Sequence, residues 1–539
     1  MNSQLEISKS IIKIASPLVL TGVLGQLIGI SDIFIAGRLS SIEQAAVSMV
    51  GIIRLISIFI AFSAATGVSA LVSQSFGAKD NKAVTKIVEH AITLTVIMSL
   101  IISVIGYFSI PYLLRFMNNL GDPMVVNYGV KFMQIYFAGF LFLMLSYVLN
   151  ASLQATGDTV TSLYLSITMV VLNIPLSFLF AFGYGPIPAY GSMGIILGTV
   201  SSWFVIVVAA FVLLFAGRKN VAIKRIFRIP SFEMYKSILS IGIPSSMEGV
   251  AKSASRVLLF RIINTTPMAS FATAALGIGL VIENLLMMVP NAAGIATMSL
   301  FGQSLGRWQL KRAKMIGNIS VVMSIIVTTI MALPVFIFAP QLIALFNKEA
   351  NEFVVNAGSS FLRINEWTLP IYGMSLLIIA MLRGAGDTKP AFYSAMIGRW
   401  LILLPFAYIT TSYFHLGIRY IWWAIVLDKF FAVIFMLFRW FSNKWQDVSL
   451  RSSLLYNNFL KGLDDKAIYD FLERIKYPIM IDSNAKEEII DGTIRYSING
   501  QNIVLERIGD AISVKEGKDL LEQIQKDYLS HNVEPQPQS

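Results

Sequence analysis

Long apolar runs separated by short polar segments occupy most of the chain. Each run has the roughly 20 residues that a helix needs to cross a bilayer. Six runs come before residue 217, and six more fall between residues 237 and 440. The predicted spans are 11–36, 46–72, 85–108, 127–150, 160–182, 192–216, 237–263, 274–300, 316–338, 361–382, 391–413 and 418–440. This pattern predicts an all-α integral membrane protein with twelve transmembrane helices in two six-helix lobes.

The two sets of runs carry the same motifs at one constant separation of 229 residues. The pairs are LQATGDT from Leu153 with LRGAGDTKP from Leu382, QSFG from Gln74 with QSLG from Gln303, and Ala45-Ala46 with Ala274-Ala275. Such a repeat indicates a duplicated bundle. Duplicated bundles are typical of transporters in which two halves alternate around a site between them. The glycines and glutamines of QSFG and QSLG are predicted to form tight turns and to satisfy backbone groups at helix ends.

Four segments are predicted from these boundaries. Residues 1–216 form an N-terminal lobe, 217–236 a basic cytoplasmic linker, 237–440 a C-terminal lobe and 441–539 a small cytoplasmic α+β domain with a disordered tail. In the last segment, alternation around Asn499-Gly500 predicts a β-hairpin, and residues 459–475 and 517–530 read as helices. This domain could bind a cytoplasmic protein partner.

Basic residues of the short loops gather on the side of the bundle that would hold both chain ends. Because cytoplasmic loops are enriched in Lys and Arg, we expect a multi-pass plasma-membrane protein with both termini in the cytoplasm. Contact with anionic membrane lipids then explains the net charge of +11, and no nucleic acid partner is expected.

Composition also argues against several function classes. The chain has no cysteine, which excludes thiol catalysis and thiolate metal sites. It carries no Walker-type glycine loop, so it has no ATP motor of its own. We therefore expect a transporter that is not an enzyme, needs no metal or cofactor, and is driven by an ion gradient or by a partner. We also expect it to be a monomer.

Ionisable residues inside apolar runs are costly and therefore mark functional sites. In the first half these are Asp32 and Arg54. Asp32 lies in the same predicted helix as Pro17, which permits bending, so this helix could couple the charge of Asp32 to its shape. The alternative is that Asp32 only caps the helix end or pairs with Arg38.

An ordered set of motifs resembles the multidrug and toxic compound extrusion (MATE) family, in its DinF-type archaeal and bacterial branch. The set comprises Pro17, Asp32, Gly37-Arg38, Ala45-Ala46, QSFG, ATGDT, Asn173 and GSMGIILGTVSSW, and then Pro244, Ala274-Ala275, GQSLG and LRGAGDTKP. The resemblance covers about residues 8 to 440 and leaves the C-terminal domain as an addition. It implies a V-shaped pair of lobes that exports organic, often cationic, amphiphiles in exchange for H⁺ or Na⁺.

The resemblance also implies roles for single residues. Asp32 takes the place of the main cation-coupling aspartate, and Asn173 that of the helix 5 asparagine. Asn150 and Thr199 fall at positions of the same polar network. Ser177 stands where many members have a second aspartate, and Tyr372 where another branch has one in helix 10. Because a hard cation needs several oxygen ligands, a single carboxylate favours H⁺ over Na⁺ as the coupling ion.

The seventh span carries an unusual charged stripe. Glu248, Lys252 and Arg256 follow one another at intervals of four residues, with Arg261 beyond, so they share a helix face. The repeat separation places Arg261 at the position of Asp32. The stripe is either a neutralised network that fixes this helix against Glu283, or a cavity surface selective for anions. Arg399 is a further buried cation.

Three function classes stay open at this stage. The first is an ion-coupled exporter of small amphiphilic molecules. The second is a flippase for a lipid-linked or anionic amphiphile, which the basic stripe favours. The third is a membrane-anchored scaffold that acts through residues 441–539.

Overall fold

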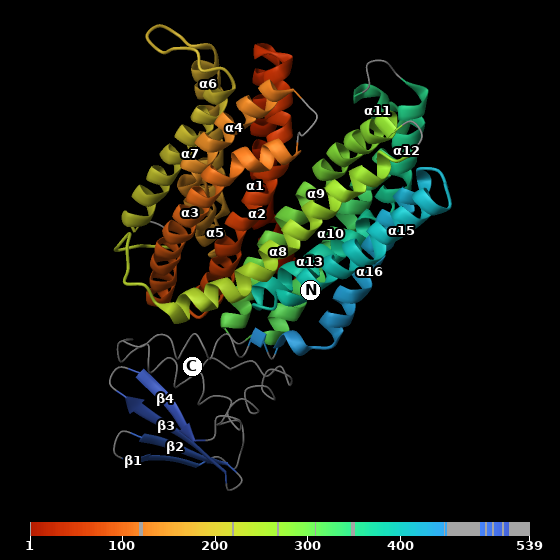
Figure 1. The fold of residues 1–539 in the computed structure, drawn as a ribbon. Helices are drawn as coiled ribbons and strands as arrows, with labels where there is room; N and C mark the ends of the chain where they lie inside the picture. Colours follow the sequence, from red (N-terminus) through yellow and green to blue (C-terminus); the bar gives the residue numbers. More distant parts are fainter. Residues whose placement is uncertain are drawn as a thin grey trace.

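The computed structural model describes residues 2–117, 122–217, 220–266, 269–307, 309–346, 351–446, 448–449, 486–490, 493–498, 501–508 and 511–516. Helices dominate this part of the chain and form two bundles that diverge toward one end (Figure 1). The prediction of an all-α membrane bundle of two lobes is confirmed.

Seven helices make the first lobe. They are α1 (Asn2–Leu39), α2 (Ser41–Gly77), α3 (Asn81–Met117), α4 (Pro123–Ala138), α5 (Phe140–Ala155), α6 (Thr159–Phe182) and α7 (Ser192–Phe215). The second lobe comprises α8 (Phe232–Ile263), α9 (Ala269–Gly306), α10 (Leu310–Ile337), α11 (Ala339–Phe346), α12 (Glu352–Glu366), α13 (Leu369–Gly384), α14 (Lys389–Met396), α15 (Leu404–Tyr408) and α16 (Arg419–Phe441), with π-helical turns η1 (Ile397–Leu403) and η2 (Ile409–Tyr413) between α14 and α16.

The spans correspond to the predicted set. Within the described ranges, nine helical segments are long and apolar enough to cross a membrane, and two bent helix pairs add two spans. The twelfth is α8, which has 32 residues and therefore the length to span. Helix α8 is less apolar than the other spans because it carries the charged stripe. Where spans carry charges, the charges must be satisfied within the bundle.

The bent pairs repeat the 229-residue separation. The first pair joins α4 to α5 at an angle of 51°, and the second joins α12 to α13 at 54°. Both second members begin and end at equivalent positions, Phe140–Ala155 and Leu369–Gly384. Gly139 ends α4, and its repeat equivalent Thr368 directly precedes α13. The break is therefore part of the duplicated architecture.

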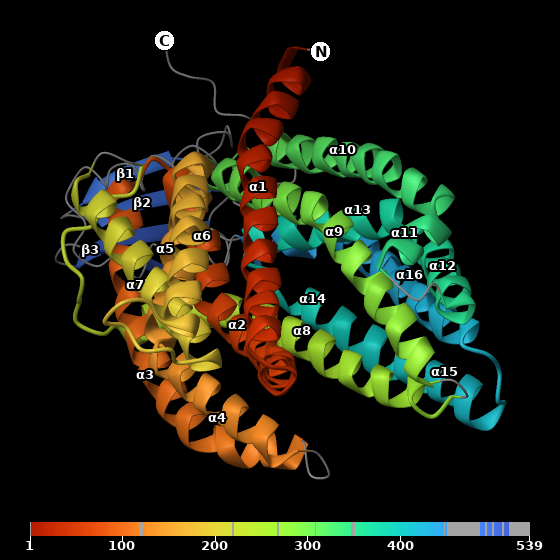
Figure 2. The ribbon, with the colours of Figure 1, turned by 90° about the horizontal axis from the view of Figure 1, so that it is seen from above.

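The lobes meet through α1, α2, α8 and α9 (Figure 2). Two glycines permit the closest contact between α2 and α8. A Cβ atom on Gly67 would overlap the carbonyl oxygen of Ile238, and one on Gly242 would overlap that of Ser63. Apolar residues of α8, α9 and α13 join the core of the first lobe, so the contact is continuous with the packing of the lobe itself.

The QSFG and QSLG motifs join the lobes reciprocally where α2 and α9 end. Nε2 of Gln74 donates to the carbonyl of Gly384 at 2.8 Å, and Nε2 of Gln303 donates to that of Ala155 at 3.0 Å. Each acceptor lies at the end of a helix in the opposite lobe. The glutamines thus satisfy helix-end carbonyls as predicted, but they do so across the interface.

The C-terminal segment contains a four-stranded antiparallel sheet in the order β1-β2-β3-β4. Its strands are β1 (Lys486–Ile490), β2 (Thr493–Ile498), β3 (Gln501–Ile508) and β4 (Ala511–Glu516). Ile498 pairs with Gln501, which confirms the predicted hairpin around positions 499 and 500. The helices predicted at 459–475 and 517–530 and the disordered end lie outside the described residues.

Candidate functional site

Asp32 and Arg54 form a buried ion pair in the first lobe. Nη1 of Arg54 on α2 donates to Oδ2 of Asp32 on α1 at 3.1 Å. The Asp32 side chain is 1% exposed and that of Arg54 18%. Arg38 lies over the Phe34 ring instead, so the alternative of an Asp32–Arg38 pair is not what the structure contains. Among the described residues, Oδ1 of Asp32 has no hydrogen-bond partner, which leaves it able to accept a proton.

Helix α1 runs continuously through Pro17. One turn beyond Pro17, the Thr21 hydroxyl donates to the Pro17 carbonyl at 3.1 Å, a side-chain-to-backbone bond that often accompanies a bend in a helix. The role of Pro17 as a hinge stays a prediction.

Three of the predicted polar residues lie together between α6 and α7. Nδ2 of Asn173 donates to the Thr199 hydroxyl at 3.0 Å, and the Ser177 hydroxyl donates to the Ile195 carbonyl at 3.1 Å. All three side chains are buried. Gly198 permits this packing, since a Cβ there would overlap Ser177.

Asn150 belongs to a different network. Its Oδ1 accepts from the Ser162 hydroxyl at 2.9 Å and its Nδ2 donates to the Ser146 carbonyl at 3.0 Å. The structure therefore groups Asn173 with Thr199 and Ser177 and places Asn150 apart from them.

In the second lobe, Glu248 holds two cations. It accepts from Nζ of Lys252 at 2.7 Å and from Nη2 of Arg383, at the end of α13, at 2.9 Å. The first contact is the favourable i, i+4 pair expected from the stripe. The second was not expected, because the sequence pattern places Arg383 in a cytoplasmic loop.

Glu283 makes its direct ion pair outside the stripe, although its charge also acts on Arg256; the predicted network between the stripe and Glu283 stays a prediction. The Glu283 carboxylate pairs with Nζ of Lys429 on α16 at 2.7 Å. Arg399 in η1 pairs with Asp428 at 2.9 Å, so this buried cation is neutralised as well.

Arg256 and Arg261 differ from their neighbours on α8. Arg261 is exposed. Arg256 is half-buried and forms no ion pair with any residue that the structure describes, although it lies within electrostatic reach of Arg399 and Glu283. The stripe thus carries one cation, Arg256, that the lobe does not neutralise directly.

In most of these pairs the cation lies nearer the surface than the acid. Glu248 is 4% exposed, against 28% for Lys252 and 31% for Arg383. Asp428 is 6% exposed, against 16% for Arg399. The reachable surface of α8 and its neighbours therefore presents guanidinium and ammonium groups, with the carboxylates beneath them. Long basic side chains extend their charged ends toward water, which accounts for the direction of this difference.

The repeat exchanges the charges of the two lobes. Asp32 corresponds to Arg261, as the motif separation predicts, and Arg54 corresponds to Glu283. The first lobe joins its acid and base directly. In the second lobe the corresponding pair is separated, because Glu283 binds Lys429 and Arg261 faces outward. The two lobes therefore hold unlike sites.

Four charged residues of this region were missed from the sequence: Glu366, Arg383, Asp428 and Lys429. Asp32 was identified because it is an ionisable residue inside an apolar run, and most of these four residues share that property. Glu366 lies in FLRINEWTLP, and Asp428-Lys429 lies in WAIVLDKFFAV, so both interrupt predicted spans. Within the described part of the chain, no group of three or more histidine or acidic residues is placed to hold a metal ion.

Comparison with known proteins agrees with this arrangement. Residues 17–179 and 244–409 match the family model MatE, so each lobe contributes one matched segment. The chain belongs to the MatE family. MatE proteins are transporters and not enzymes, so the prediction of a multi-pass membrane transporter of this family is confirmed.

Relatives and solved structures extend the MatE match to most of the chain. This chain is 25% identical to the probable multidrug resistance protein YoeA of Bacillus subtilis, over 75% of this chain and 87% of that protein. It is 23% identical to the probable multidrug resistance protein NorM of Thermotoga maritima, over 82% and 94%. A MOP superfamily transporter from Pyrococcus furiosus, described as having a binding pocket of reverse polarity, shares the fold with a TM-score of 0.74 at 22% identity, over 83% and 96%.

Proposed function

We propose that this MatE protein is a secondary active antiporter that exports small amphiphilic organic compounds in exchange for H⁺. The observation that carries the proposal is the buried Asp32–Arg54 pair, which joins the first two helices of one lobe. Relatives named as multidrug resistance proteins support the substrate class. We also propose that both termini lie in the cytoplasm. The ends of the lobes that diverge would then face the outside of the cell.

Proton binding to Asp32 supplies the coupling step. With Asp32 ionised, its carboxylate holds Arg54 and thereby fixes α1 against α2. When a proton arriving from outside neutralises Asp32, the Coulombic attraction ends and the guanidinium keeps only a weaker hydrogen bond. The freed α1 can then repack around Pro17, which weakens the substrate site and releases the compound. Return of the proton to the cytoplasm restores the pair.

The ligands around Asp32 favour a proton over Na⁺. Arg54 already occupies one carboxylate oxygen, and a hard cation needs several further oxygen ligands. A guanidinium 3.1 Å from the carboxylate also repels a metal ion.

The first prediction is that Asp32→Asn abolishes export driven by a pH gradient, because the amide preserves size and cannot titrate. The measurement is efflux of a fluorescent cationic amphiphile from proteoliposomes under an imposed gradient. Asp122→Asn is a matched control: it changes an exposed aspartate that caps α4, and asparagine caps equally well. Normal export by the folded Asp32→Asn protein would refute the assignment.

A specific observation favours a second candidate, in which the substrate carries an anionic group. Lys252, Arg383 and Arg399 are more exposed than their acid partners, and Arg256 has no ion-pair partner among the described residues. A flippase or exporter of an anionic amphiphile would use these groups to hold the acid. A structural neighbour with a pocket of reverse polarity indicates that the fold accommodates such a change.

A further inference from the structure

Glu366 is a buried carboxyl group that the mechanism above does not use. It is the last residue of α12, directly before the 54° break to α13, and it is completely buried. Across the described ranges neither of its carboxylate oxygens finds a hydrogen-bond partner. A carboxylate buried in this way without a partner is too costly to keep ionised, so the group is carried with its proton.

The neighbours of Glu366 supply one cation for two carboxyl groups. Lys429 of α16 is 3% exposed and is already bound to Glu283 of α9 at 2.7 Å. Both of these charges act on Glu366. One ammonium neutralises one carboxylate, so the trio is electrically neutral only while Glu366 holds its proton. Carboxyl groups that share a buried site cannot both ionise freely, and their protons belong to the site as a whole.

The repeat shows that the fold does not require these charges. At the equivalent break of the first lobe, Phe137 stands where the second lobe has Glu366, and Val200 where it has Lys429. Val200 packs directly on Gly139 at that break, as Lys429 lies beside Thr368 at the other. Apolar residues therefore suffice at these two positions, whereas Glu283 corresponds to the charged Arg54. Since apolar replacements of buried charges are often neutral or stabilising, stability does not explain why Glu366 and Lys429 are charged.

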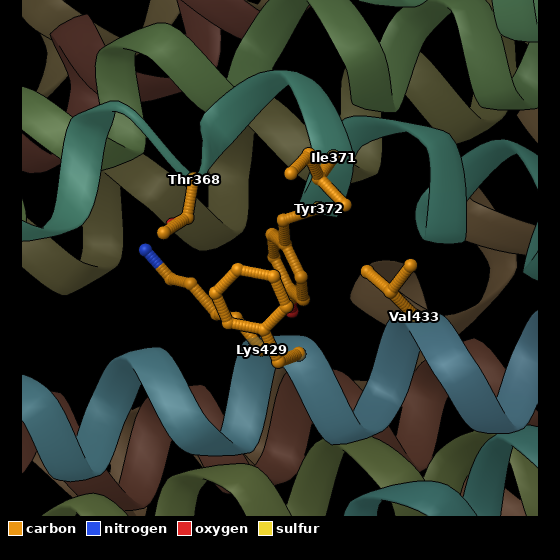
Figure 3. A pocket seen from close by; sticks show the side chains of 6 residues that line it. Thr368, Ile371, Tyr372, Lys429 and Val433 are labelled. Atoms are coloured by element: carbon orange, nitrogen blue, oxygen red, sulfur yellow. The ribbon is translucent and has the colours of Figure 1, made fainter.

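Lys429 lies close to the bend between α12 and α13. Its side chain borders a small hollow lined by Thr368, Ile371, Tyr372, Lys429, Phe430 and Val433. Figure 3 shows its amine pointing toward Thr368, two residues beyond Glu366. The centroid of the Tyr372 ring lies 5.7 Å from the Lys429 ammonium. The ring therefore gives this ammonium a cation–π contact in addition to its ion pair with Glu283.

We propose that Glu366 is a second proton-binding residue of this transporter, located at the hinge between α12 and α13. When its proton leaves for the cavity, the Lys429 ammonium is shared between Glu283 and the new Glu366 carboxylate. The trio then changes from neutral to one negative charge. Lys429 joins α16 to α12 in that state, so proton loss stabilises a different arrangement of the bent span. Other charges that surround the trio are Arg256 of α8, Arg399 of η1 and Asp428 of α16.

The test is an infrared titration of the purified full-length protein in lipid nanodiscs. An Asp32→Asn background removes the first-lobe carboxyl group. In this background we expect an infrared absorption band from the carbonyl stretch of a protonated carboxyl group. The band should disappear when the pH is raised. Adding Glu366→Gln should abolish this band, whereas Glu352→Gln, an exposed acid at the start of the same helix, should leave it unchanged.

Two results would overturn the proposal: absence of the band in the Asp32→Asn background, or its survival after Glu366→Gln. If the glutamine variant does not fold, Glu366→Asp decides, because the band should move in frequency if Glu366 carries the proton and stay unchanged if it does not. In otherwise wild-type protein, Glu366→Gln should release one proton fewer per bound substrate. Only this last measurement rests on the proposed antiport. The infrared result stands even if Asp32→Asn exports normally.

Discussion

At the scale of single residues, the two lobes treat their buried charges differently. Asp32 has a single cationic partner, whereas Glu248 has two and Glu366 has none among the described residues. A carboxylate held by two cations stays ionised and acts as a fixed charge. Of these three groups, Asp32 and Glu366 are the ones that we propose to exchange protons.

Arg256 provides the residue-scale prediction. If it faces the substrate cavity as a free cation, Arg256→Gln should weaken binding of an anionic amphiphile by about tenfold or more. A charge contact at about 4–6 Å contributes a few kcal/mol at an effective dielectric of ~20, and 1.4 kcal/mol corresponds to a tenfold change in Kd. Fluorescence titration with an anionic and a cationic dye of matched size measures the effect.

Arg261→Gln is the matched control, because Arg261 is on the same helix and exposed. It should leave both dye affinities unchanged. Tight binding of the cationic dye by the wild type, unaffected by Arg256→Gln, would contradict an anion-selective surface.

At the scale of elements, the ends of α2 and α9 hold the lobes together. A Cβ atom on Gly77 would overlap the carbonyl oxygen of Gln303, and one on Gly306 would overlap that of Gln74. Hydrogen bonds from the two glutamines to the opposite lobe complete the contact. Separating the lobes at this end breaks both glutamine bonds, which suits a two-state movement of the lobes.

Gly77→Val tests this contact. The added side chain cannot fit against Gln303, so the two helix ends should separate by on the order of a few ångströms and the closed population should fall. Because the chain has no cysteine, spin labels on Asn81→Cys and Lys311→Cys report this distance alone. Gly51→Val on the same helix is the control, since nothing lies within 4 Å of a Cβ there. Equal distances in both variants would refute the role of the glycine contact.

At the level of the whole molecule, the family match lies within the two lobes. The segment after α16 remains attached through Trp445, which is fully buried and stacks on Trp440 at 5.0 Å and beside Phe301 at 5.4 Å. The family match ends at residue 409, so the C-terminal sheet lies outside it. A binding role of this domain toward a cytoplasmic protein stays a prediction, as does the monomeric state.

Deleting residues 446–539 should therefore leave transport by the purified bundle within about twofold of the full chain, because Trp445 and every described helix up to α16 are retained. A deletion that begins at Lys444 instead should lower the melting temperature, since it removes a large aromatic side chain from the core. Proteoliposome efflux and melting curves measure both. Loss of transport by the folded 446–539 deletion would show that the domain takes part in the mechanism.

The twelve spans, the duplication and the resemblance to the family were predictable from the order of residues. Span length follows from bilayer thickness, and a repeat is visible in the order of residues alone. Asp32 and the Glu248–Lys252 pair were also predictable, because a buried charge and an i, i+4 spacing are local properties.

Which charges form pairs could not be predicted from the sequence and depends on the packing of the helices. Arg54 for Asp32, Lys429 for Glu283 and Arg383 for Glu248 are partners from different helices. Helix rotation and the bends at Gly139 and Thr368 set these pairings, and they depend on packing across the whole lobe. The same reason placed Asn150 apart from Asn173 and left Glu366 without a partner in the described structure. Spacing along one helix fixes which residues share a face, whereas the fold fixes what that face meets.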